Sequence, residues 1–148
     1  MKSSFRTFAL AAIAAASFAA STHTASAQAY SRNASADYQL EASGYVTVNA
    51  LILGKTGAFT LGGQQTFVNQ GTQPVYVYCW LSTVAGSNSL LPYGPLSSVT
   101  IASGAYATLP LNGFYTAGAT EIYVVCRATN PSGSVLSLSG NITAAYVP

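Results

Sequence analysis

The chain from residue 44 onward is a succession of short stretches in which apolar and polar side chains alternate. Alternation of this kind predicts β-strands, because successive side chains of a strand point to opposite faces of its sheet. The clearest case is Pro74–Leu81, which places four apolar residues on one face and three aromatic residues on the other. The apolar set is Val75, Val77, Cys79 and Leu81, and the aromatic set is Tyr76, Tyr78 and Trp80.

Seven stretches of this kind are separated by segments rich in Gly, Pro, Asn and Ser, which are typical of turns. They are Gly44–Leu53, Gln65–Asn69, Pro74–Leu81, Leu96–Ile101, Ala105–Leu111, Thr120–Arg127 and Ser134–Val147. None of the segments between them shows a sustained helical period. The pattern therefore predicts an all-β fold, an antiparallel β-sandwich of about seven short strands in one domain, 44–148.

The nearest known architecture is immunoglobulin-like, but its sequence marks are absent. Trp80 follows Cys79 directly instead of lying on the next strand. Tyr123 precedes Cys126 by three residues, where the tyrosine corner of that fold requires two. We therefore expect a sandwich and assign no particular family.

The alternation also assigns faces and connections. The residues expected to point inward from the first strand are Val46, Val48, Ala50 and Ile52, and those from the last are Leu136, Leu138, Ile142, Ala144 and Tyr146. Ala102-Ser103-Gly104 is expected to close a hairpin between Leu96–Ile101 and Ala105–Leu111. Asn112-Gly113 is a strong turn signal immediately after that hairpin.

The first 29 residues predict a secretory signal peptide. Lys2 and Arg6 form a basic start, Phe8–Ala20 is an apolar run, and small residues lead to an expected cleavage after Ala27 or Ala29. The apolar run is shorter than the ~20 residues that a membrane-spanning helix needs. We therefore expect a secreted, periplasmic or cell-surface protein whose mature chain has no transmembrane helix. Residues 30–43 are polar and are expected to form a flexible N-terminal arm.

Without the leader the chain is nearly neutral, because the net charge of +2 comes entirely from Lys2 and Arg6. The remaining charged residues cancel and are Arg32, Lys55, Arg127, Asp37, Glu41 and Glu121. With no basic patch for a phosphate backbone, nucleic acid is excluded as a partner. Weak repulsion between copies favours self-association or binding to another surface protein, for example by adding Gly44–Leu53 or the C-terminal strand to a neighbour's sheet.

The two cysteines, Cys79 and Cys126, each lie on the apolar face of a predicted strand. A pair of cysteines in an exported chain predicts one disulfide, either across the core or between neighbouring strands of one sheet. The alternative is two separate buried thiols that pack as small apolar residues.

Little in the sequence favours catalysis. The only histidine, His23, lies in the predicted leader, so the commonest general base and metal ligand is missing from the mature chain. Cys79 and Cys126 lack the spacing of metal ligands. We therefore expect a protein that is not an enzyme, with no catalytic residues, no metal site and no cofactor.

The aromatic face of Pro74–Leu81 is the sharpest binding candidate. Tyr76, Tyr78 and Trp80 present flat apolar rings with polar tips, which is the chemistry that stacks against sugars. The simpler interpretation is that aromatic residues favour strands and that a loop or the second sheet covers this face. The sequence thus predicts a non-enzymatic exported β-sandwich with a structural or assembly role, the alternative being a carbohydrate- or ligand-binding module.

Overall fold

The computed structural model describes residues 29–40, 44–91, 94–118, 120–129 and 135–148, and these residues form eight β-strands and no helix. The strands are β1 (Ala29–Leu40), β2 (Val46–Ile52), β3 (Gly57–Asn69), β4 (Val75–Ser82), β5 (Ser97–Ile101), β6 (Tyr106–Ala117), β7 (Glu121–Ala128) and β8 (Val135–Val147). The predicted all-β sandwich is confirmed, with eight strands where the sequence indicated about seven.

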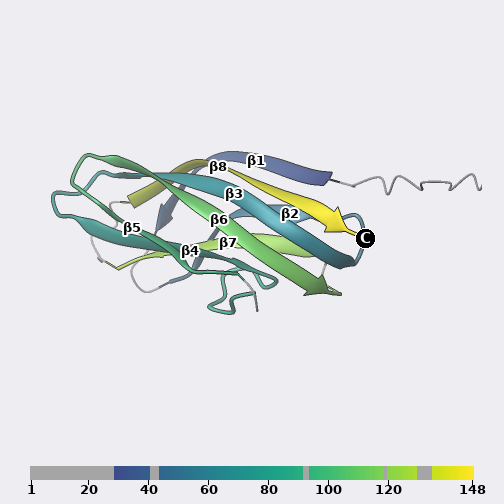
Figure 1. Ribbon diagram of the computed structural model, residues 1–148. Coiled ribbons are helices and arrows are strands. Elements are labelled where there is room, and N and C mark those ends of the chain that lie inside the picture. The colour runs from purple at the N-terminus through teal and green to yellow at the C-terminus, as the bar shows by residue number, and fades with distance from the viewer. Residues whose placement is uncertain (1–28, 41–43, 92–93, 119, 130–134) are drawn as a thin grey trace, which may run out of the picture.

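Two four-stranded antiparallel sheets pack face to face (Figure 1). Sheet A has the order β1-β8-β3-β6, and sheet B has the order β2-β7-β4-β5. The first strand pairs with the last, the second with the seventh, the third with the sixth and the fourth with the fifth. This nested pairing is that of a jelly roll rather than of an immunoglobulin domain, which divides seven strands differently.

The strand order decides which strands are edges. The edge strands β1 and β2 contact each other along one side of the sandwich, and β5 and β6 contact each other along the opposite side. The C-terminal strand β8 lies between β1 and β3. The hypothesis that β8 could add to a neighbour's sheet is therefore wrong, because both of its edges are already paired.

The core lies between the inner faces of the two sheets. Phe59 and Phe67 of β3 are fully buried, as are the inward residues predicted for β4 and for β7. Those residues are Val75, Val77, Cys79, Leu81, Ile122, Val124 and Cys126. The amide of Gln65 is buried between the sheets, and its Nε2 donates to Ser137 Oγ at 2.7 Å. Among the described residues no helix has the length and apolar character needed to cross a bilayer.

The predicted flexible arm is wrong for residues 30–40, which belong to β1. This strand pairs with β8 from Ala29↔Ala145 to Leu40↔Val135, with a register irregularity between Ser35 and Tyr38. The irregularity interrupts the period of two, and the outer face of the strand is polar, so the sequence shows no apolar rhythm. Leu40 is nonetheless buried in the core. The end of the predicted arm, 41–43, lies outside the described residues.

The predicted hairpin around Ala102-Ser103-Gly104 is also wrong. β5 pairs with β4 in sheet B and β6 pairs with β3 in sheet A, so the connection crosses from one sheet to the other. The Asn112-Gly113 turn is likewise absent, since both residues lie within β6 opposite Gly62 and Leu61. Glycine serves close packing here, because a Cβ at Gly113 would lie 3.1 Å from Leu81 Cδ1.

Bulges explain the two strands whose faces were assigned incorrectly. In β2, Thr47 pairs with Val125 and Asn49 with Val124, so Val48 is an extra residue and the alternation reverses after it. Leu51 is therefore buried, while Ile52 is 62% exposed. In β8, Ser139 pairs with Thr66 and Ser137 with Phe67, which leaves Leu138 as the extra residue. Ser137 is buried in consequence, and Leu136 does not share the inward face of Ile142.

Candidate functional site

Cys79 and Cys126 form the predicted disulfide, so neither is a free thiol. The two residues are paired in register on β4 and β7, with a Cα–Cα distance of 4.1 Å. The bridge therefore links neighbouring strands within sheet B and does not cross the core. Both side chains are fully buried, so the disulfide is a structural element beneath the outer face of the sheet.

The aromatic stripe, which consists of Tyr76, Tyr78 and Trp80, runs along the outer face of β4. The ring centroids of Tyr76 and Tyr78 are 5.9 Å apart, and those of Tyr78 and Trp80 are 5.8 Å apart in a stacked arrangement. The structure therefore brings the three predicted residues together. Their surroundings differ, since Tyr76 is 40% exposed and Trp80 only 2%.

The loop that follows β4 covers the Trp80 end of the stripe. Trp80 Nε1 donates to the carbonyl oxygen of Ser87 at 3.2 Å, and Leu91 N donates to the carbonyl oxygen of Leu81 at 2.9 Å. Val125, the neighbour of Trp80 on β7, is fully buried although it belongs to the outer face. The surface that remains open for stacking is therefore offered by Tyr76 and part of Tyr78.

Two residues that sequence reasoning missed extend this aromatic cluster. The Tyr45 ring meets Trp80 edge to face with centroids 5.4 Å apart, and the Arg127 guanidinium lies 5.3 Å from the Tyr45 centroid. Tyr45 precedes β2, and β7 lies between β2 and β4 in sheet B, so the Tyr45 ring meets Trp80 across the intervening strand. Pairing across strands, which no local pattern encodes, makes this contact.

Glu121 and Tyr123 form a hydrogen-bonded pair on β7. Tyr123 OH donates a hydrogen bond to Glu121 Oε2. This hydrogen bond, together with desolvation and the carboxylate charge, raises the pKa of Tyr123 above its ordinary value. Within the described ranges, no group of three or more His, Cys, Asp or Glu side chains is placed to hold a metal ion.

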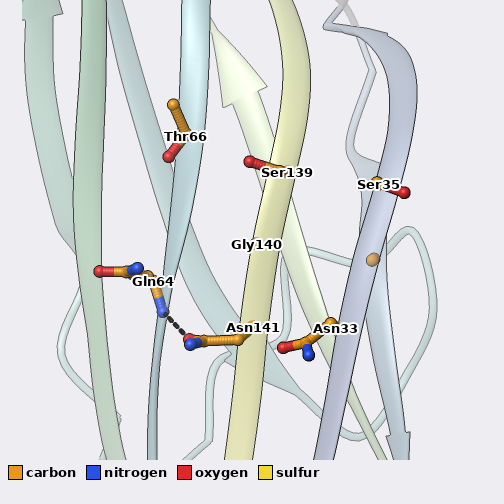
Figure 2. Close-up of a pocket in the computed structure, with 8 residues that line it drawn as sticks. Asn33, Ser35, Gln64, Thr66, Ser139, Gly140 and Asn141 are labelled. Carbon is orange, nitrogen blue, oxygen red and sulfur yellow. Dashed lines mark hydrogen bonds between the residues drawn. The ribbon is translucent and has the colours of Figure 1, made fainter.

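The outer face of sheet A is covered by uncharged polar side chains in register. One row across the strands is Asn33, Asn141 and Gln64, and the next is Ser35, Ser139, Thr66 and Thr108. The two rows enclose a shallow hollow of about 300 Å³, which we call the polar hollow (Figure 2). The alternation of Ser, Asn and Thr along 134–147 indicates a polar face on the last strand. Its partners on β1, Asn33 and Ser35, could not be found because they fall within the predicted arm.

Charge is unevenly distributed over the sandwich. No Asp, Glu, Lys, Arg or His occurs between Lys55 and Glu121, an interval that contains all of β3, β4, β5 and β6. The side formed by β5 and β6, which we call the neutral side, spans 96–118 and has no charged residue. It carries Tyr106, which is 70% exposed, and Leu96, which is 49% exposed.

A scan of the sequence against known protein families finds no match, and a search of curated proteins finds none either. Solved structures do match the fold. A structure of infectious bursal disease virus, Gx strain, aligns with a TM-score of 0.58 at 16% identity over 81% of this chain and 33% of that one. The VP2 subviral particle of the same virus aligns with a TM-score of 0.53 at 16% identity over 82% of this chain and 33% of that one.

A TNF domain, Eiger from S. frugiperda, aligns with a TM-score of 0.48 at 10% identity over 82% of this chain and 93% of that one. This chain spans about a third of the length of the viral proteins that it matches. The likeness to the two viral structures, at 16% identity, shows the fold alone, a jelly-roll sandwich, which agrees with the strand order.

Proposed function

We propose that this protein is a non-enzymatic, exported β-sandwich with a structural or assembly role, in which copies associate through the neutral side. The observation that carries the proposal is the absence of charge from β5, β6 and their connection, combined with the exposure of Tyr106 and Leu96. Large exposed apolar side chains in an uncharged surface are typical of protein–protein contacts.

The sheet edges support association less than the composition of this side does. Each edge strand carries a feature that hinders strand addition: a register irregularity in β1, the bulge in β2, only five residues in β5, and Pro110 in β6. The proposed contact is therefore made by side chains of the neutral side rather than by continuing a sheet into the next copy.

Lysine substitution tests the assembly role. Tyr106→Lys and Leu96→Lys put a charge into the proposed contact, and Thr143→Lys puts the same charge on an exposed position at the centre of sheet A. Sedimentation velocity and light scattering over a range of concentrations should show association of the wild type and of Thr143→Lys, and monomers for the other two. A wild type that is monomeric at every concentration contradicts the proposal.

Export is the second part of the proposal, and the disulfide supports it. Disulfides persist in oxidising compartments outside the cytoplasm, and Cys79–Cys126 is fully formed and buried. The chain is expressed with residues 1–29 in a bacterial host, and the intact mass of the product is measured in each cell fraction. The expected product begins at Gln28 or at Tyr30. A full-length product confined to the cytoplasm contradicts export.

The second candidate is a carbohydrate-binding module that uses the aromatic stripe of Tyr76, Tyr78 and Trp80. The observation in its favour is the row of three rings, whose neighbouring centroids are 5.9 and 5.8 Å apart, with Tyr76 exposed. Because Trp80 is covered, Tyr76→Ala rather than Trp80→Ala is the informative variant. Loss of binding on a glycan array in Tyr76→Ala, with association unchanged, would favour the binding module over the assembly role.

A further inference from the structure

The polar hollow lies on the face of the sandwich opposite the aromatic stripe and does not belong to the proposed contact. Three strands line it, since Asn33 and Ser35 come from β1, Ser139 and Asn141 from β8, and Gln64 and Thr66 from β3. Figure 2 shows these side chains in two rows across the strands, around Gly140. Its volume of about 300 Å³ is at the lower end of the usual range for small-molecule sites, roughly 300–1,000 Å³.

The side chains of the hollow are uncharged donors and acceptors. An amide offers two donors and an acceptor, and a hydroxyl offers one donor and two acceptor lone pairs. In the described part of the chain, the side chains of Asn33, Gln64 and Ser139 make no hydrogen bond to protein. Their hydrogen-bonding capacity is therefore available to a ligand, which would replace water.

Three members of the rows are held in place. Asn141 Oδ1 accepts a hydrogen bond from Gln64 N at 3.0 Å, so the donor nitrogen of the same amide is aimed from a fixed position (Figure 2). The hydroxyls of Thr66 and Thr108 are 3.0 Å apart and share a hydrogen bond. Groups fixed before binding lose less conformational entropy when a ligand arrives.

Bulges adjoin the hollow on two of its three strands. Leu138 is the extra residue of β8, and the pairing of β1 is irregular between Ser35 and Tyr38, so both interruptions lie next to Ser139. Bulges bend a strand and change the direction of neighbouring side chains, and they are enriched next to functional sites. They give a second reason, independent of the polar composition, to regard this place as a site.

From these observations we infer that the polar hollow binds an uncharged, hydroxyl-rich ligand, namely a short segment of a neutral glycan. Vicinal sugar hydroxyls are donors and acceptors at once, as the amides and hydroxyls of the rows are. An anionic ligand is disfavoured because no Lys or Arg lines the hollow, and an apolar ligand is disfavoured because hydroxyls and amides form its walls.

The inference is tested with four uncharged probes and one anionic probe. The neutral probes are cellohexaose, xylohexaose, mannohexaose and chitohexaose, and the anionic comparison is a heparin hexasaccharide. Amide chemical shifts of the isotopically labelled wild-type protein are followed during each titration. Binding of at least one neutral hexasaccharide with a Kd below about 1 mM, with shifts confined to residues 33–35, 64–66 and 139–141, is the expected result.

Variants then separate this site from the aromatic stripe. Asn33→Ala combined with Gln64→Ala removes two amides that have no protein partner, and it should weaken binding at least tenfold. Asn112→Ala, an exposed amide of β6 outside the hollow, and Tyr76→Ala on the opposite face should leave affinity unchanged. Failure of all four neutral probes to bind, or loss of binding in Tyr76→Ala alone, overturns the inference. Neither result bears on association through the neutral side.

Discussion

Gln65 and Gly140 face each other across the β3–β8 pair so closely that no other residue fits at the glycine. A Cβ built on Gly140 would lie 1.8 Å from Gln65 Oε1 and 2.7 Å from the carbonyl oxygen of Gln64. The Gln65 amide fills the place of that Cβ and, from the same position, donates to Ser137 Oγ. The floor of the polar hollow is therefore a backbone position that permits no side chain.

Gly140→Ala should destabilise the protein, because the backbone oxygen of Gln64 cannot move aside as a flexible side chain would. Overpacking of this kind costs about 1–3 kcal/mol in the free energy of unfolding. Chemical denaturation of the variant checks the value. Gly118→Ala is the control, since a Cβ there has no neighbour within 4 Å and its φ is not positive. Equal stability of the two variants would contradict the close approach seen here.

The disulfide should account for a large part of the stability. Cys79 and Cys126 are 47 residues apart in sequence, and the loop-entropy relation gives about 4 kcal/mol for a closure of that length. Cys79→Ala combined with Cys126→Ala should therefore unfold at a much lower denaturant concentration than the oxidised wild type. In a strong reducing agent the difference between the two proteins should largely vanish. A difference that persists after reduction would mean that packing, rather than the covalent link, is responsible.

Asn69, the last residue of β3, should be a sensitive polar position because its side chain binds the segment that follows β3 and the last residue of β5. It is fully buried, its Nδ2 donates to the carbonyl oxygens of Gln73 and Ile101 at 2.8 and 3.0 Å, and its Oδ1 accepts from Gly71 N at 2.9 Å. Asn69→Ala leaves buried groups without partners and should cost roughly 3 kcal/mol. Asn69→Asp should cost more at neutral pH, because a carboxylate would face two carbonyl oxygens.

Thermal denaturation measures both Asn69 variants, and Asn88→Ala, an exposed amide in the loop after β4, serves as the comparison. If Asn69→Asp proved as stable as the wild type, the donor role assigned to Nδ2 would be wrong.

Trp80 fluorescence reports the cover over the aromatic stripe. Because the indole is 2% exposed and hydrogen bonded to Ser87, acrylamide should quench it weakly in the folded protein and strongly in denaturant. Trp80 is the only tryptophan, so the signal has a single source. Strong quenching of the folded protein would show that the loop after β4 leaves the ring open, and it would restore Trp80 as a stacking surface.

The ionisation of Tyr123 should depend on Glu121. The hydrogen bond to the carboxylate favours the neutral phenol and raises its pKa, so Glu121→Gln should lower the pKa of Tyr123 towards the ordinary tyrosine value, about 10. Since the folded-state pKa is raised, the stabilising contribution of this contact is present below the ordinary pKa and is lost as pH rises through the raised one. Ultraviolet titration of phenolate formation should show one tyrosine that ionises at a lower pH in Glu121→Gln than in the wild type.

The sequence predicted the sandwich, the disulfide and the inward faces of β4 and β7, because these strands keep an uninterrupted period of two. Prediction failed where one residue changes the period, as Val48 does in β2 and Leu138 in β8. It also failed at Gly113, where a residue typical of turns instead permits close packing against Leu81. The aromatic stripe could be predicted because all of its residues belong to one strand, β4. The polar hollow could not, because its residues come from three strands whose pairing no local pattern encodes.

The place of β8 between β1 and β3 has a consequence for how the chain reaches its final form. Sheet A cannot close until the last strand has been synthesised, because β1 has no partner in that sheet other than β8. The facing edges of β1 and β3 therefore stay open at least until synthesis has passed β8, and until then both can pair with other chains.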